Sequence, residues 1–169
     1  AKKHVLCEKP LAMDIATAKK MVDIAAECGV VFATNHHLRC SGTHRKIRDI
    51  IAAGTIGTVF SARINHAVSL PERLRGWRLD SAAKGAGVVF DIVVHDVDTI
   101  RAALGAEVSE ATALVSTKSL GQNGIEDTSM CVFRMSNGAL VSTHESFIVP
   151  HGVTSFEING NAGSIIATR

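Results

Sequence analysis

The sequence predicts an α+β fold: a short parallel β-α-β piece followed by a mostly antiparallel, open sheet with helices on one face. Three observations carry this prediction. Two strand-like runs within residues 4–33 flank a helical pattern, which is typical of a parallel unit. A second region of helical periodicity ends at Gly105. After it, five strand-like segments follow with no helix between them, which favours antiparallel pairing. We expect the boundary between the two parts near residue 38.

The composition is that of an ordinary globular protein. Its 169 residues suit about one domain, with 46% hydrophobic and 20% charged residues. A net charge of +2 gives no indication of nucleic-acid binding. No apolar run reaches the roughly 18 residues of a membrane span. The four cysteines form no C-x-x-C pair, so we expect reduced, mostly buried thiols, as in a cytoplasmic protein.

The first part begins with a short strand over residues 4–7, which ends at Glu8-Lys9-Pro10. The proline biases Lys9 toward an extended conformation at the strand end. Asp14 is a candidate N-cap, helical spacing follows, and Gly29 predicts the stop. Residues 30–33 are a second buried strand, and polar residues 34–37 follow it. Sites in parallel sheets lie at such strand ends.

The next segments are a helix over residues 43–53 and a half-buried strand over residues 58–66. Residues 70–83 show no period and are predicted to be a loop. This loop contains the only tryptophan, Trp77, directly before Arg78. An aromatic ring beside a guanidinium could stack on a flat ligand. The alternative, which stays open, is that Trp77 plugs an edge of the core.

Residues 85–98, GAGVVFDIVVHDVD, form the segment around which the chain is organised. We predict that it continues as a helix to the stop at Gly105. Asp91 and His95 lie four residues apart and therefore share a face of that helix. A carboxylate beside an imidazole can orient the ring and tune its proton affinity. The pair is equipped for proton transfer, although a satisfied pair inside a core is equally consistent with these residues.

The last part reads as a meander of strands at residues 110–117, 128–135, 139–147, 153–158 and 164–167. Asn137-Gly138 between two of them predicts a type I′ hairpin. Alternation within the third strand gives one face with a mixed character, and we expect this face to be the outer one, open to a partner. Its residues are Val141, Thr143, Glu145 and Phe147.

Single motifs leave other chemistry open. No complete G-x-G-x-x-G, P-loop, G-x-S-x-G or H-E-x-x-H occurs in the sequence. Adjacent His95-Asp96 could belong to a metal-dependent hydrolase, and His36-His37 could also be ligands, but each needs further partners. A non-catalytic oligomerisation module is a third alternative.

Two motifs together are far more specific. Residues 3–10, KHVLCEKP, resemble the E-K-P signature of the Gfo/Idh/MocA oxidoreductases, and residues 85–98 resemble that family's D-x-x-x-H-D-x-D signature. Residues 35–39, NHHLR, and the hairpin-like residues 157–164, EINGNAGS, are also similar. The resemblance covers essentially the whole chain. Ala86 departs from it, because the family usually has glycine there.

The resemblance implies NAD- or NADP-dependent hydride transfer between a nicotinamide and a sugar or polyol carbon, with NADP slightly favoured. Lys9 would hydrogen-bond the reacting oxygen, and His95 would donate or accept the proton. Asp91 would orient His95 or bind a substrate hydroxyl. The residues implied for cofactor binding are Glu8, Lys9, Asn35, Trp77 and Arg78, with no metal.

The resemblance also implies the surroundings of this chain. Residues 1–38 would be the tail of an NAD(P)-binding Rossmann domain, and residues 39–169 an incomplete α+β domain for substrate binding and dimerisation. We expect a fragment, which lacks a Rossmann half before it and a helical segment after it. The implied partners are a small sugar or polyol and a second subunit bound through the open sheet, with no nucleic acid or membrane.

Overall fold

The computed structural model describes residues 2–121 and 124–168. The chain divides into two compact units, residues 1–37 and 38–169, each with its own internal contacts. The division falls after residue 37, one residue before the predicted boundary after residue 38.

The first unit is a parallel β-α-β piece made of β1 (Val5–Glu8), α1 (Ile15–Glu27) and β2 (Phe32–Asn35). The strands pair in parallel, with Glu8 opposite Asn35 at the ends of both strands. Asp14 caps α1, because its carboxylate accepts the Thr17 N–H at 2.7 Å. The predicted cap and helix are therefore confirmed, while the second strand begins two residues later than expected.

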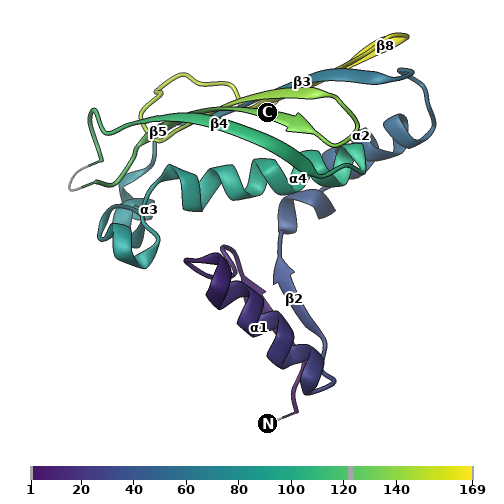
Figure 1. The fold of residues 1–169 in the computed structure, drawn as a ribbon. Helices are drawn as coiled ribbons and strands as arrows, with labels where there is room; N and C mark the ends of the chain where they lie inside the picture. Colours follow the sequence, from purple (N-terminus) through teal and green to yellow (C-terminus); the bar gives the residue numbers. More distant parts are fainter. Residues whose placement is uncertain (1, 122–123, 169) are drawn as a thin grey trace. The chain divides into compact units, whose positions relative to one another are not determined.

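The second unit has one sheet with two long helices on one of its faces (Figure 1). Its helical segments are η1 (His37–Cys40), α2 (Gly42–Ala52), α3 (Glu72–Arg75), η2 (Gly76–Leu79), η3 (Ala82–Lys84), η4 (Val89–Val93) and α4 (Val94–Leu104). Its strands are β3 (Val59–Ala67), β4 (Val108–Ser116), β5 (Thr128–Met135), β6 (Leu140–Ser146), β7 (Ser155–Gly160) and β8 (Gly163–Thr168). The predicted α+β class is confirmed.

The order of the strands differs from the predicted meander. The sheet runs β4-β5-β6-β3-β7-β8, so that β3 lies between β6 and β7. It pairs in parallel with β6 and antiparallel with β7, and the other neighbours are antiparallel. The predicted meander was wrong because the residue pattern of a strand indicates which side chains are buried, but it does not indicate which strand is its neighbour in the sheet. The insertion places the N-terminal strand of this unit at the centre of the sheet.

The turn between β5 and β6 is a hairpin of another type than predicted. A type I′ turn needs positive φ at both central residues. Only Gly138 has a positive φ in this turn, at 89°. Its N–H donates to the Met135 carbonyl at 2.8 Å, so Ser136 and Asn137 are the central residues and Gly138 follows them. This is a right-handed turn closed by a left-handed glycine.

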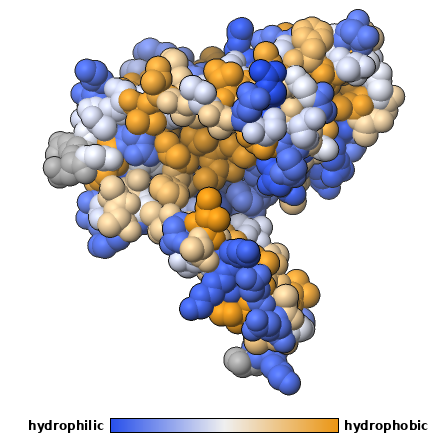
Figure 2. All heavy atoms as spheres, in the orientation of Figure 1, coloured by the Kyte–Doolittle hydropathy of each residue, from blue (hydrophilic) through white to orange (hydrophobic). Residues whose placement is uncertain are grey.

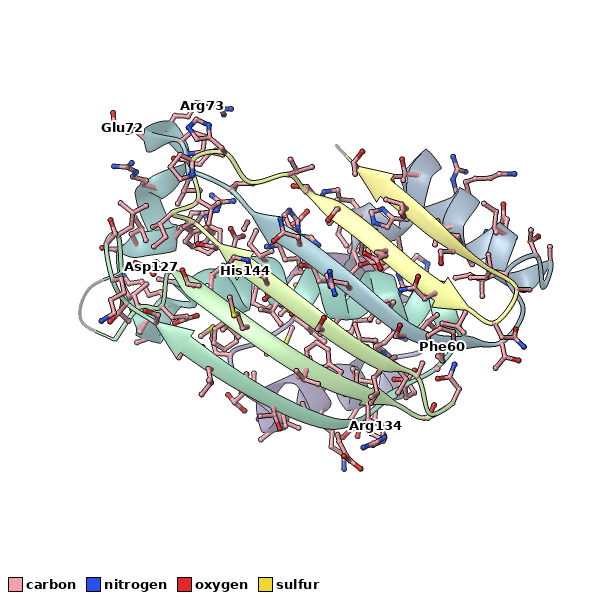
Figure 3. All side chains as sticks on the ribbon, turned by 90° about the horizontal axis from the view of Figure 1, so that it is seen from above. Phe60, Glu72, Arg73, Asp127, Arg134 and His144 are labelled. Carbon is pink, nitrogen blue, oxygen red and sulfur yellow. The ribbon has the colours of Figure 1, made fainter. Side chains whose placement is uncertain are left out.

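The face of β6 that was predicted to be open is the core face. Val141, Thr143, Glu145 and Phe147 are at most 4% exposed, and they face the helices. The alternate residues, including Leu140 and His144, lie on the bare face, which Figure 3 views from above. The parity of an alternating strand marks two faces, but the helices α2 and α4 decide which one is buried. Figure 2 shows hydrophobic side chains gathered between the sheet and α4.

Two further predictions, on a loop and on the cysteines, are corrected by the structure. The predicted loop over residues 70–83 contains three short helical segments, α3, η2 and η3. All four cysteines are free, as expected, but only Cys131 is buried. The predicted helix ending at Gly105 is confirmed, with a first turn, η4, in π conformation. Among the described residues, no helix is both long and apolar enough to cross a membrane.

Candidate active site

The segment η4–α4 carries the predicted acid–base residues. Asp91 lies in the π turn and is 3% exposed, and His95 lies one turn later at 6% exposed. π turns in helices are frequent at functional sites. The helix therefore brings the carboxyl and imidazole to one buried region, as the four-residue spacing predicted.

Asp91 forms an ion pair with Arg78. The Arg78 Nε lies 2.6 Å from Asp91 Oδ2, and Nη1 donates to the Leu74 carbonyl at 3.1 Å. A buried carboxylate needs such a partner, because its charge loses water on burial. The expected role of Asp91, orienting His95 or binding a substrate hydroxyl, stays a prediction. The structure adds that Arg78 holds one oxygen of this carboxylate.

Each carboxylate of the D-x-x-x-H-D-x-D segment has a basic partner from a different element. Asp91 pairs with Arg78 of η2. Asp96 Oδ1 lies 3.1 Å from Nδ1 of His66 in β3. Asp98 pairs with both Arg39 Nε, at 2.7 Å, and Arg39 Nη2. The three side-chain pairs attach the helix to the loop, the sheet and the start of the second unit.

The sequence did not predict these partners of Asp96 and Asp98. Arg39 lay inside the quoted NHHLR motif, so its place in the motif was a signal, but nothing indicated Asp98 as its partner. His66 lay at the end of an alternating strand with no distinguishing pattern. Contacts across 59 and 30 residues are not visible in local periodicity.

The Asp96–His66 pair has perturbed proton affinity. Burial raises the pKa of Asp96, and the hydrogen bond from His66 acts against this rise. For His66, burial acts to lower the pKa, but the hydrogen bond and charge of Asp96 raise it overall. Because the pKa values of Asp96 and His66 are both raised, the pair retains a proton more readily than either free side chain. A cavity of about 650 Å³ adjoins it, lined by residues of α2, β3, α4, β7 and β8.

Glu145 is a further buried acid close to this pair. It is fully buried in β6, and burial is the main cause that raises its pKa to about 7. The charge of Asp96 adds to the rise, while the Thr143 hydroxyl and His66 oppose it. Glu145 was expected on the outer face of the sheet. Its position on the core face gives the second unit an acid that titrates near neutrality.

Trp77 lies at the surface beside Arg78. Its exposed fraction is 47%, and the Arg78 guanidinium carbon lies 4.6 Å from the centre of its ring. A half-exposed ring is a poor core plug, and it leaves aromatic surface available to a flat ligand. The cation–π contact fixes the ring next to the Arg78–Asp91 pair.

In the first unit, Glu8 and Asn35 meet at the ends of the two parallel strands. The Asn35 side-chain amide donates to Glu8 Oε1 at 2.7 Å. Lys9 follows β1 directly. Ligands of doubly wound sheets bind at the carboxyl ends of parallel strands, so the position suits the predicted cofactor residues. Lys9 belongs to a different unit from Asp91 and His95.

The alternative of a metal-dependent hydrolase requires a set of metal ligands, and residues 2–121 and 124–168 contain none. No group of three or more His, Cys, Asp and Glu side chains there is arranged to hold a metal ion. Asp96, which that alternative required as a ligand, instead pairs with His66. The described geometry therefore gives no support to a metal-dependent hydrolase.

Comparison with known proteins agrees with this geometry. Residues 44–166 match the GFO/IDH/MocA C-terminal domain, and residues 1–36 match the NAD-binding Rossmann fold of the oxidoreductase family. The chain belongs to the GFO/IDH/MocA oxidoreductase family. The resemblance inferred from the E-K-P and D-x-x-x-H-D-x-D signatures is confirmed. Within the family, residues 34–39, 76–79 and 91–98 had suggested 1,5-anhydro-D-fructose reductase as the nearest type.

The relatives are sugar and polyol enzymes. The chain is 47% identical over 166 residues to 1,5-anhydro-D-fructose reductase of Ensifer adhaerens, which covers 98% of the chain and 50% of the relative. It is 30% identical to myo-inositol 2-dehydrogenase of Thermotoga maritima, over 99% of the chain and 50% of the relative. A structure of levoglucosan dehydrogenase in complex with NADH and levoglucosan is 28% identical, with a TM-score of 0.86, over 98% of this chain and 47% of that one. The chain thus spans about half the length of these relatives.

Proposed function

We propose that this chain is part of an NAD(P)-dependent oxidoreductase that transfers hydride between a nicotinamide and a carbonyl or hydroxyl carbon of a sugar or polyol. The observation that carries the proposal is the helix on which Asp91, paired with Arg78, lies one turn before His95. It occurs in a family whose relatives named above act on sugars and polyols. A compound similar to 1,5-anhydro-D-fructose is the favoured substrate, because that reductase shares 47% identity.

The first unit fits the nicotinamide end of NAD or NADP. Glu8 and Asn35 present a carboxylate and an amide, joined by a 2.7 Å hydrogen bond, at the carboxyl ends of β1 and β2. Polar groups at that edge suit a carboxamide and a ribose. Bound there, the dinucleotide would supply or accept the hydride. The complex of levoglucosan dehydrogenase with NADH supports this cofactor class.

The roles of the protein residues follow from their chemistry. The Lys9 ammonium would donate to the substrate oxygen and stabilise negative charge that develops there. In reduction, His95 would give its proton to this oxygen as hydride reaches the carbon, and in oxidation it would take the proton back. Asp91, held by Arg78, would orient His95 or bind a neighbouring hydroxyl. Trp77 would stack against the dinucleotide.

Steady-state kinetics test this proposal, measured on a protein that has the full length of the relatives. Lys9→Ala and His95→Ala should each lower kcat by roughly two to four orders of magnitude, with circular dichroism unchanged. Lys20→Ala and His151→Ala are matched controls, since both side chains are exposed and outside the candidate site. Near-normal turnover of either test variant would refute the assignment.

We also infer that the bare face of the sheet binds a second copy of the chain. Its strands expose large apolar side chains among polar ones, including Met130 at 58%, Val132 at 53% and Leu140 at 46%. Arg134 and His144 lie on the same face (Figure 3). A face of this mixed character is typical of a surface that a partner covers, because contiguous apolar surface is costly to leave exposed to water.

A further inference from the structure

A distant side chain occupies the turn that precedes the helix carrying Asp91 and His95. Gly87 has a φ of +111°, and the position that a Cβ would take there lies 2.3 Å from Oε1 of Glu126. The same oxygen accepts the Val89 N–H at 3.0 Å. The backbone carbonyl of Glu126 accepts the Val88 N–H at 3.1 Å. The φ of residue 87 favours glycine, and the Glu126 carboxyl group occupies the space that a side chain would take there.

Glu126 supplies what the helix start lacks in its own sequence. The first amides of a helix have no partner within it, and a local Ser, Thr, Asp or Asn usually accepts from them. Val88 stands at the cap position and has no side chain to do so. The Glu126 side-chain oxygen takes that role from 37 residues away.

Asp127, the residue after Glu126, binds the backbone of the loop that precedes it. Asp127 Oδ2 accepts three consecutive backbone N–H groups, those of residues 119–121, at 2.8 to 3.0 Å. The Asp127 carbonyl accepts the Phe147 N–H at 2.9 Å, just beyond β6. The loop that carries Glu126 is therefore attached to the end of β6, an interior strand of the sheet, and Glu126 transmits this position to the helix.

The other side of the same turn belongs to Arg78. The Gly87 N–H donates to the Arg78 carbonyl at 3.0 Å, and the Arg78 side chain holds Asp91. The turn is thus held between Arg78 and Glu126, immediately before the first buried turn of the helix. A shift of the turn would move Asp91 and, one turn later, His95.

We propose that Glu126 is a positioning residue for Asp91 and His95, which acts by filling the turn at Gly87 and accepting the Val89 N–H. The proposal rests on the proposed function for the roles of Asp91 and His95. Glu126 is not expected to touch substrate or cofactor. Its effect on the reaction would pass through the helix.

Two variants separate hydrogen bonding from charge. Glu126→Gln keeps the length and one acceptor oxygen but removes the charge, whereas Glu126→Asp keeps the charge but is one methylene too short to reach Val89. The His95 imidazole and the Asp91 carboxyl are followed by NMR during a pH titration of the 169-residue chain. Glu126→Asp should change the chemical shifts and midpoints of both groups, and Glu126→Gln should leave them as in wild type.

The opposite pattern, a change in Glu126→Gln with none in Glu126→Asp, would show that charge is responsible and would overturn the proposal. No change in either variant would also overturn it. Glu110→Gln, at an exposed acid of β4, controls for the loss of one charge. In a protein as long as the relatives, Glu126→Asp should lower kcat about 10- to 100-fold with the dinucleotide KM unchanged, whereas Glu126→Gln should keep the kcat of wild type. Absence of activity in wild type would refute the proposed function, while the NMR result would still decide the role of Glu126.

Discussion

Arg78 and Asp91 form a 2.6 Å ion pair that joins the exposed η2 segment to the buried first turn of the η4–α4 helix. The Asp91 side chain is 5% exposed and that of Arg78 is 23% exposed. The pair also places Trp77, which packs on Arg78, at the edge of the candidate active site. The ion pair therefore connects the predicted cofactor-contacting loop to the predicted acid–base helix.

Removal of Arg78 should leave a buried carboxylate without this partner. We expect Arg78→Met to destabilise the chain by about 2–4 kcal/mol, because a buried ion that loses its partner is strongly unfavourable. Asp91→Asn in addition should recover part of this loss. A double-mutant cycle measured by urea unfolding gives the coupling energy of the pair.

The exposed Arg48–Asp49 pair is the matched control for this cycle. Its side chains are 54% and 60% exposed, so Arg48→Met should cost less than about 1 kcal/mol. Equal effects of Arg78→Met and Arg48→Met would contradict a buried ion pair at Asp91.

Glu145 should make stability depend on pH in a defined range. Its pKa is about 7 in the folded chain, against a reference value of 4.5. Below the pKa of the unfolded chain, this acid is protonated in both states and does not change the free energy of unfolding. As the pH rises from there through the pKa of the folded chain, the burial of the charge makes the folded chain less stable. Glu145→Gln should therefore match wild type near pH 4 and be more stable by roughly 2–3 kcal/mol near pH 8.

Urea unfolding of wild type and Glu145→Gln at several pH values measures this difference. Glu110→Gln is the control, since Glu110 is exposed on the edge strand. A stability difference between wild type and Glu145→Gln that stays constant across this range would show that Glu145 ionises as an ordinary surface acid.

Asp127 should be essential for the loop before β5. Burial alone would raise its pKa, but the hydrogen bonds from the loop amides lower it overall. Asp127→Ala leaves three amides without their acceptor and should cost about 2–4 kcal/mol, and Asp127→Asn should cost less. Hydrogen exchange should accelerate at residues 119–121 in Asp127→Ala. Unchanged exchange there would mean that the loop is held by other contacts.

Trp77 should matter more for the cofactor than for folding. In the protein at the length of its relatives, Trp77→Ala should raise the KM for the dinucleotide several-fold, and Trp77→Phe less, because a smaller ring keeps part of the stacking. Its 47% exposure predicts a stability loss of about 1 kcal/mol or less. A variant that melts several degrees lower with unchanged KM would make Trp77 a core residue instead.

The bare face of the sheet should control assembly. If it binds a second copy, Met130→Asp and Val132→Asp should convert a dimer to a monomer in sedimentation equilibrium without loss of secondary structure. Ile15→Asp, at an 88% exposed residue of α1, should leave assembly unchanged. A wild-type chain that stays monomeric at high concentration would remove this interface.

The sequence by itself determined most of the longer elements, and several of their ends. Local chemistry explains this success: the Asp14 side chain can cap only its own helix, and Gly105 supplies the left-handed residue at which α4 stops. The four-residue spacing of Asp91 and His95 likewise needs only a helix to share a face. Two signatures at a suitable separation then sufficed for the family.

Only the tertiary structure decided which of these elements meet. The insertion of β3 beside β6, and the burial of the Val141–Phe147 face, depend on where α2 and α4 pack. Glu126 and Gly87 meet across the chain, as do His66 and Asp96, and no local periodicity records such contacts. Alternation in a strand and helical spacing specify which side chains share a face of their own element. The partner on that side comes from a distant segment, and it sets the charge, burial and proton affinity of the site.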